Sequence, residues 1–168
     1  MTLIVNAKDK TLHVDAATYL CRIGKAGFVA GDKGREGDLK TPLGTYCARY
    51  GFYRADRVPP PPGPLTFHAI KSDDGWCDAP GDMAYNMPVR LPYPASAEVM
   101  WKDNGVYDIV IVLSHNDSPP QPGLGSAIFL HVARSDDKAT AGCIAVSPDV
   151  MAAILPGLKP GAEIVIQA

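Results

Sequence analysis

The chain of 168 residues has the length of one domain, and we expect residues 1–168 to form a single domain. Its 16 basic and 18 acidic residues give a net charge of −2 without a basic run, which argues against a nucleic-acid-binding protein and against a basic membrane-surface helix. The 16 glycines and 16 prolines together are 32 of the 168 residues, a larger share than the average of about 12%. This composition favours short elements joined by turns over a helix bundle.

The N-terminal part of the chain is predicted to form short strands. Thr2–Asn6 and Thr11–Asp15 flank a Lys-Asp-Lys turn and are typical of a hairpin, and Tyr19–Ile23 predicts the next strand. Residues 30–43 are polar and rich in glycine, so they predict a long loop. Gly44–Tyr50, with its aromatic and β-branched residues, predicts another strand.

The middle of the chain alternates between loops and apolar runs. Pro59–Pro64 is a stiff connector, because proline donates no backbone hydrogen bond to a sheet. Leu65–Ile70 predicts a strand, and residues 72–94, rich in Asp, Gly, Pro and Met, predict an irregular excursion. Val106–Ser114 is almost continuously apolar and predicts a strand buried on both faces, and Ser126–Val132 predicts a second central strand.

The C-terminal part contains the one clear helix. Cys143–Val146 is a short apolar strand, after which Ser147 is a good N-cap and Pro148 fits the first helical position. Pro156 and a following glycine end this short helix, and Ala162–Gln167 predicts the last strand. About nine short strands and one helix predict a mainly β, mixed-strand sandwich or open barrel.

The first residues of the chain bear on its location. They form a strand pattern directly after Met1, without a charged segment and a long apolar run, so we expect no secretory signal and a cytoplasmic protein. The alternative is a periplasmic protein whose signal has been removed. No run of 18 apolar residues that could cross a bilayer is present.

One histidine and one cysteine are the candidates for chemistry. His131 ends an apolar strand. Cys143 lies twelve residues after His131 and directly follows Gly142. A cysteine nucleophile needs a nearby base, and a neighbouring imidazole is expected to lower the pKa of the Cys143 thiol. It also needs donors for an oxyanion, and the glycine opens the backbone N–H groups of residues 142 and 143 to a substrate. Cys21, Cys47 and Cys77 are interpreted as small buried apolar residues, since no Cys-x-x-Cys motif occurs.

These segments resemble the signature of the YkuD-type L,D-transpeptidase family. Gly125–Arg134 followed by Thr140–Val146 matches a histidine that ends a strand, a variable loop, and then Ser/Thr-x-Gly-Cys. Arg35–Tyr46 is similar to the Thr-Pro-x-Gly turn of the family, and Tyr107–Asn116 is similar to its central strand. The shorter subgroup with Thr-Ala-Gly-Cys is the better match.

The resemblance implies a mixed-β catalytic fold and a thioester mechanism that needs no metal or other cofactor. It implies that Cys143 is the nucleophile, that His131 is its base, oriented by the Val132 carbonyl, and that the N–H groups of Gly142 and Cys143 bind the oxyanion. Thr140 matches the Ser/Thr position of the family. The implied partner is a peptidoglycan stem peptide or muropeptide; the sequence does not assign an oligomeric state.

Two further residues are candidates for substrate binding. With Thr140, we expect Arg134 and His115 to contact the substrate, by holding a carboxylate or lining the cleft. The chain departs from the best-known members by Ala141 in place of histidine, by Ala145 in place of arginine or asparagine, and by a loop of only eleven residues between the histidine and the cysteine. These departures leave open which acceptor takes the acyl group.

The predicted function is that of an L,D-carboxypeptidase, which releases the terminal D-Ala from tetrapeptides in muropeptide recycling. The main alternative is an L,D-transpeptidase that forms cross-links or exchanges D-amino acids in the cell wall. Two further alternatives are a hydrolase with zinc on His115, His131 and Cys143, and a β-module that binds the wall without catalysis.

Overall fold

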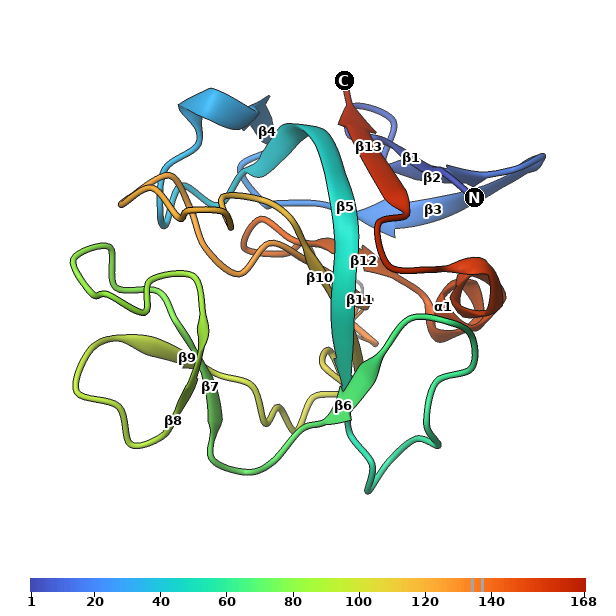
Figure 1. Cartoon of the computed structure of the whole chain (residues 1–168). Helices are drawn as coiled ribbons and strands as arrows, with labels where there is room; N and C mark the ends of the chain where they lie inside the picture. The colour runs from blue at the N-terminus through green and yellow to red at the C-terminus, as the bar shows by residue number, and fades with distance from the viewer. Residues whose placement is uncertain (134, 137) are drawn as a thin grey trace.

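The main feature of the computed structural model is a closed β-barrel (Figure 1). The model describes every residue except 134 and 137. The barrel strands are β1 (Leu3–Asn6), β2 (Thr11–Val14), β3 (Ala17–Arg22), β5 (Thr41–Tyr53), β10 (Ile109–Leu113), β11 (Phe129–Val132), β12 (Ile144–Val146) and β13 (Glu163–Gln167). They pair in the order β10-β11-β12-β3-β2-β1-β13-β5, and β5 pairs again with β10, which closes the sheet.

Strand β5 is the longest element and joins the two ends of the barrel sheet. Its first part pairs antiparallel with β13 and its second part with β10, where the register shifts between Ile111 and Leu113. The short strands β4 (Phe28–Ala30) and β6 (Phe67–Ala69) add parallel pairs to β5, and a 3₁₀ turn at Gly31–Lys33 follows β4. The predicted strand at Gly44–Tyr50 is confirmed but extends three residues further at each end.

A second, three-stranded antiparallel sheet lies beside the barrel. It consists of β7 (Asp74–Cys77), β8 (Pro88–Arg90) and β9 (Ala97–Val99), and we call it the cover sheet. The prediction of an irregular excursion over residues 72–94 is therefore wrong for seven residues of β7 and β8. Each strand has only three or four residues between turns, which is too short for an alternating pattern to be recognised.

The barrel wall under the cover sheet is buried on both faces. Ile111, Leu130 and Ile144 point into the barrel and belong to its core. Their neighbours Val110 and Phe129 point outward and pack in a second core with the cover-sheet residue Trp76. This double burial confirms the prediction for the apolar run after residue 106, although the strand itself begins at Ile109.

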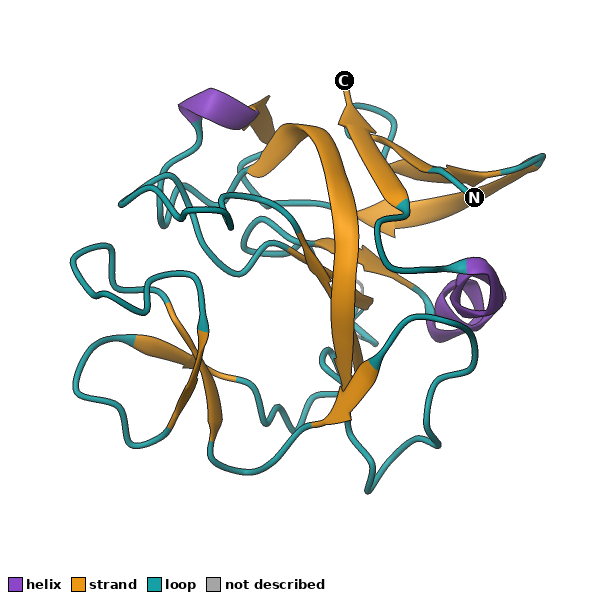
Figure 2. Ribbon diagram, in the orientation of Figure 1, coloured by secondary structure: helices purple, strands orange, loops and turns teal. Residues whose placement is uncertain are grey.

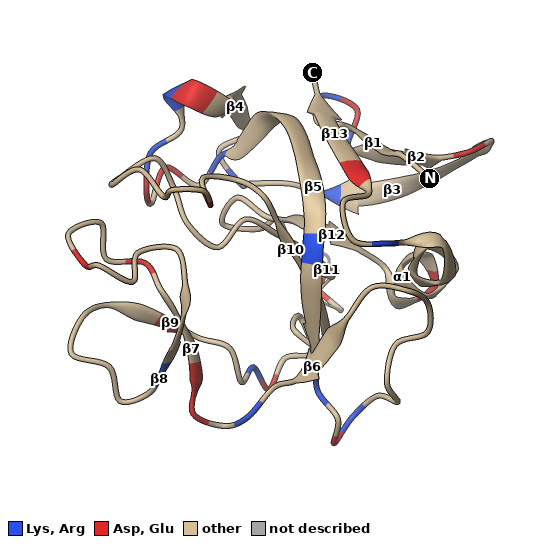
Figure 3. Ribbon diagram, in the orientation of Figure 1, with Lys and Arg blue, Asp and Glu red and all other residues tan. Residues whose placement is uncertain are grey.

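The helix and the fold class are confirmed. Helix α1 (Pro148–Ile154) begins after Ser147, whose hydroxyl accepts a hydrogen bond from Val150 N–H at 3.3 Å, and a 3₁₀ turn at Leu155–Gly157 follows it. Figure 2 shows how little of the fold is helical, in agreement with a mainly β domain, although the described residues form thirteen strands instead of about nine. None of the described helices is long and apolar enough to cross a membrane. Acidic and basic residues are interspersed along the ribbon in Figure 3.

One buried amide links the cover sheet to the barrel. The Oδ1 atom of Asn86 accepts hydrogen bonds from Trp76 Nε1 and Ala127 N–H, both at 3.0 Å. Its Nδ2 group donates to the carbonyl oxygens of His115 at 3.0 Å and Asn116 at 2.8 Å. All four hydrogen-bonding positions of the amide are therefore used, and Asn86 is only 8% exposed.

We expect Asn86→Ala to lower the free energy of unfolding by about 2–4 kcal/mol, because it leaves buried donors and acceptors without partners. Urea unfolding followed by tryptophan fluorescence measures the change. The matched control is Asn6→Ala, which removes one exposed hydrogen bond to Asp9 N–H and should cost less than about 1 kcal/mol. Equal losses in the two variants would contradict the role assigned to Asn86.

Candidate active site

Parallel pairing of β11 and β12 brings the predicted base and nucleophile together. His131 is opposite Ala145 in the register of these strands. Since side chains alternate along a strand, Cys143 lies on the same face of the sheet as Ala145 and His131. The two residues are thus diagonal neighbours on adjacent strands, and both face the cover sheet.

Both side chains line one cavity of about 490 Å³, which we call the cleft. Its walls come from the barrel wall, from the cover sheet and from the loop before β5. Glu98, Lys102 and Tyr107 form one side, and Glu36 and Leu39 form another. The cleft is large enough for a short peptide, and its polar lining can orient one.

The Cys143 sulfur is buried and held by two backbone groups. Its Sγ atom donates to the Ala127 carbonyl oxygen at 3.1 Å and accepts from Phe129 N–H at 3.4 Å. The residue is 8% exposed. Burial raises the pKa of the thiol to about 12, and the nearby Glu98 carboxylate acts in the same direction. Cys143 is therefore a neutral thiol at neutral pH.

The His131 ring is also neutral, and its tautomer is fixed. Its Nδ1 atom lies 2.7 Å from the Val132 carbonyl oxygen, which can only accept, so Nδ1 carries the proton and Nε2 is left as a base. Burial lowers the pKa of His131 to about 4, against the opposing effect of the carbonyl groups of Val132 and Val106. The Tyr107 ring packs edge-on at 5.4 Å from the imidazole and restricts its rotation.

The raised pKa of Cys143 contradicts the expectation that the neighbouring imidazole lowers it. A local argument from an imidazole beside a thiol predicts a lowered thiol pKa, whereas burial under the cover sheet raises it. The predicted nucleophile is thus a thiol, and the predicted base on the neighbouring strand is unprotonated.

The loop before the cysteine is held by its own threonine. Thr140 Oγ1 donates to the Cys143 carbonyl oxygen at 2.7 Å and accepts from Gly142 N–H at 3.1 Å. The expectation that Gly142 N–H binds an oxyanion is thus corrected, because that donor is already used. Thr140 lines the cleft, but its hydroxyl shapes the loop and is not free for the substrate.

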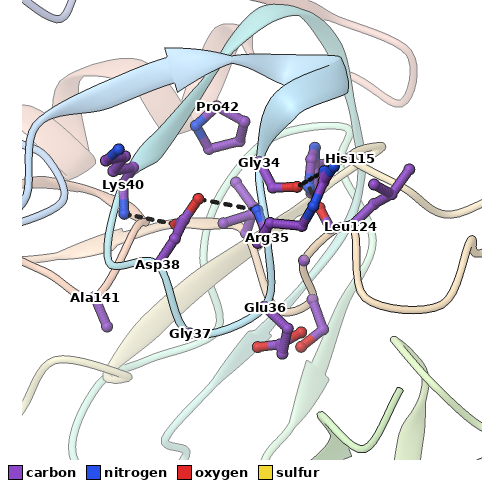
Figure 4. Close-up of a pocket in the computed structure, with 13 residues that line it drawn as sticks. Gly34, Arg35, Glu36, Gly37, Asp38, Lys40, Pro42, His115, Leu124 and Ala141 are labelled. Atoms are coloured by element: carbon purple, nitrogen blue, oxygen red, sulfur yellow. Dashed lines mark hydrogen bonds between the residues drawn. The ribbon is translucent and has the colours of Figure 1, made fainter. Parts of the chain in front are cut away.

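The structure describes one of the two remaining predicted substrate contacts, His115. His115 is buried and lies 3.2 Å from the Leu124 carbonyl oxygen through Nε2, and burial lowers its pKa. It lines a small neighbouring pocket of about 40 Å³ together with Arg35 and Lys40 (Figure 4), not the cleft itself. His115 is thus not among the residues that line the cleft, although Glu36, Ser126 and Ala141 line both cavities, and its contact with a substrate stays a prediction. Arg134 lies outside the described residues.

Three cleft residues were not predicted from the sequence. Tyr107 donates its hydroxyl hydrogen to Glu98 Oε1 at 2.8 Å, and Lys102 Nζ lies 3.2 Å from the same oxygen. The spacing of Glu98 and Lys102, four residues apart, is a pairing signal only in a helix, whereas here Glu98 lies within β9 and Lys102 in the loop that follows. Their place in the cleft results from the cover sheet, which the sequence does not predict.

Comparisons with known proteins identify the family. The YkuD family profile, described as the L,D-transpeptidase catalytic domain, matches residues 1–166. The chain belongs to the YkuD family of L,D-transpeptidase catalytic domains. The matched residues include both His131 and Cys143.

Solved structures with similarity to the chain include L,D-transpeptidase 1 of Mycobacterium tuberculosis, at 13% identity and a TM-score of 0.47, with 99% of this chain and 61% of that one covered. An L,D-transpeptidase from Mycobacterium smegmatis has 15% identity and a TM-score of 0.46, over 99% of this chain and 58% of that one. The helical cell shape determining protein Pgp2 from Campylobacter jejuni has 15% identity and a TM-score of 0.46, over 98% and 46% of the two chains. The chain spans less than two thirds of each of these proteins. A search of curated proteins gives no significant match.

The zinc alternative does not fit the arrangement of side chains. It requires His115 beside His131 and Cys143, and His115 faces the neighbouring pocket instead. Among the described residues, no three side chains of His, Cys, Asp or Glu lie close enough together to hold a metal ion.

The burial of His131 predicts that stability depends on pH. Its pKa is about 4 in the folded chain and near 6.5 when exposed, so the unfolded chain binds the proton more readily. The stabilisation is fully present above pH 6.5 and is lost as the pH falls toward about 4. When the pH falls from about 7.5 to about 4.5, we expect the free energy of unfolding of wild type to fall by about 2 kcal/mol more than that of His131→Gln. Urea unfolding at the two pH values measures the difference. Parallel losses in the two proteins would show that His131 is not buried as a neutral ring.

Proposed function

We propose that this chain is an L,D-carboxypeptidase in which Cys143 attacks the third residue of a peptidoglycan tetrapeptide and water completes the reaction. The observation that carries the proposal is the neutral pair of Cys143 and His131 on one face of the barrel wall, lining a single cleft. A cytoplasmic location goes with this assignment, because muropeptides released during recycling are soluble fragments.

The acylation step follows from the protonation states of the pair. The Cys143 sulfur forms a bond to the carbonyl carbon of the third stem residue while its proton passes to His131 Nε2. The electron pair of the carbonyl moves to its oxygen. When the tetrahedral intermediate collapses, the carbon–nitrogen bond breaks and the imidazolium gives its proton to the amine of the leaving D-Ala.

The second step returns the enzyme to its resting state. Water attacks the thioester carbon and gives a proton to His131 Nε2, after which the carbon–sulfur bond breaks. The sulfur takes that proton back and regains its hydrogen bond to the Ala127 carbonyl oxygen. The products are a tripeptide and free D-Ala.

The surroundings of the sulfur favour water as the acceptor. Ala141 and Ala145 line the cleft beside Cys143, and neither side chain can hydrogen-bond to an incoming amine. The loop between His131 and Cys143 has only eleven residues, which limits the surface that can bind a second substrate. Water needs no such surface, whereas an amine at millimolar concentration does.

We expect Cys143→Ala to lower turnover of a tetrapeptide muropeptide by a factor of at least about 10⁴, because no other group can form the thioester. Product formation measured by mass spectrometry gives the rate. The control is Cys47→Ala, which changes a half-buried cysteine outside the cleft and should retain most activity. Turnover that survives in Cys143→Ala would exclude this mechanism.

We expect tripeptide and free D-Ala as the main products even with a millimolar D-amino acid present. The same reaction followed by mass spectrometry separates hydrolysis from exchange, since exchange gives a tetrapeptide of altered mass. Ala145→Asn restores a polar side chain beside the sulfur and should raise the share of exchanged product. A wild-type enzyme that forms mostly exchanged tetrapeptide is a transpeptidase, and the carboxypeptidase proposal then fails.

A further inference from the structure

The peptide group that joins Gly142 to Cys143 is oriented by a residue 101 positions away along the chain. Thr41 Oγ1 donates a hydrogen bond to the Gly142 carbonyl oxygen at 2.8 Å. The same oxygen atom of Thr41 accepts from Gly24 N–H at 2.8 Å. Thr41 is completely buried, so no solvent competes for either hydrogen bond.

The backbone around Thr41 is fixed as well. Its N–H donates to the Gly27 carbonyl oxygen at 2.9 Å, and Thr41 pairs with Phe28 where β4 meets β5. On the other side, Thr140 N–H donates to the Ile23 carbonyl oxygen at 2.9 Å. Residues 23–27 thus hydrogen-bond both to Thr41 and to the loop before Cys143, and they link these two segments.

Gly142 is the residue that this close packing requires. Its φ angle is +142°, which side chains disfavour, and a Cβ atom there would lie 3.0 Å from the Lys40 carbonyl oxygen. Figure 4 shows Lys40, the residue before Thr41, on the same side of the small pocket as Ala141. The turn and the loop therefore approach each other through their backbones.

The orientation of this peptide group has a chemical consequence. The Gly142–Cys143 peptide is trans, so its C=O and its N–H point in opposite directions. Because Thr41 holds the C=O, the Cys143 N–H points away from Thr41. Within the described part of the chain, Cys143 N–H has no hydrogen-bond partner, whereas Gly142 N–H is bound by Thr140.

We propose that Thr41 is a positioning residue, which aims the Cys143 N–H at the oxyanion formed when the Cys143 sulfur attacks a carbonyl group. The inference rests on the proposed role of Cys143 as nucleophile, but not on the identity of the peptide substrate. An oxyanion donor contributes a factor of about 10²–10³ to the rate only if it is aimed in advance. The hydroxyl of Thr41 supplies that alignment without touching the substrate.

The test compares two reactions of the same sulfur. Acylation of Cys143 by p-nitrophenyl acetate passes through an oxyanion, whereas alkylation by iodoacetamide does not. We expect Thr41→Val, which keeps the shape and removes the hydroxyl, to slow acylation by about 10- to 100-fold and to change alkylation by less than about twofold. Mass spectrometry of the peptide that contains Cys143 gives both rates in the intact protein.

Two further variants control the experiment. Thr41→Ser keeps the hydroxyl and should retain acylation within about threefold of wild type, and Thr45→Val makes the same substitution at an exposed site of β5 and should change neither reaction. If Thr41→Val does not fold, Thr41→Ala carries the same expectation, because it removes the hydroxyl without adding a methyl group.

Three results would overturn the inference: equal slowing of acylation and alkylation, unchanged acylation in Thr41→Val, or no rescue by Thr41→Ser. A further result comes from wild type alone. When a peptide aldehyde adds to Cys143, the Cys143 N–H and not the Gly142 N–H should become protected from hydrogen exchange; the reverse pattern would also overturn the inference. Failure of wild type to cleave a tetrapeptide, with ester acylation intact, would concern the proposed substrate only.

Discussion

The parallel pairing of β11 with β12 is the constraint on which the site depends. It puts His131 opposite Ala145, and hence Cys143 on the same face of the barrel as the imidazole. A shift of one residue in this register would turn the sulfur toward the barrel core. The apolar residues that alternate with them, Leu130 and Ile144, are fully buried in that core and hold the register. The chemistry is thus positioned by the packing of residues that take no part in it.

The cover sheet sets the electrostatics of the pair. Because it buries the second face of the barrel wall, Cys143 and His131 both lie in a poorly hydrated environment that favours their neutral forms. A neutral thiol is a weaker nucleophile than a thiolate. The backbone groups of Ala127 and Phe129 hold the sulfur in place. Burial therefore lowers the general nucleophilicity of Cys143.

Local patterns in the sequence predict much of the fold and the two central residues of the site. The strand at Ile109–Leu113 is predicted because burial on both faces leaves a continuous apolar run, and helix α1 is predicted by its N-cap and its proline. His131 and Cys143 are found because they flank a short loop in a recognisable motif. These features are encoded by residues close together in the chain.

The features that the sequence does not predict depend on long-range contacts. The strands of the cover sheet are too short to show a period, so the places of Glu98, Lys102 and Tyr107 in the cleft are not predicted. The role of Thr41 depends on a hydrogen bond across 101 positions, which no spacing rule can reveal. The sign of the Cys143 pKa shift is missed for the same reason, since the burial comes from a distant segment.

The central claim is that Cys143 forms a thioester with the third residue of a peptidoglycan stem. Rapid mixing of the enzyme with a tetrapeptide muropeptide, acid quenching and peptide mapping by mass spectrometry test it most directly. The account predicts a tripeptidyl group on the peptide that contains Cys143, formed as fast as D-Ala is released. An enzyme that releases D-Ala without any covalent adduct, or with the adduct on another residue, would contradict it.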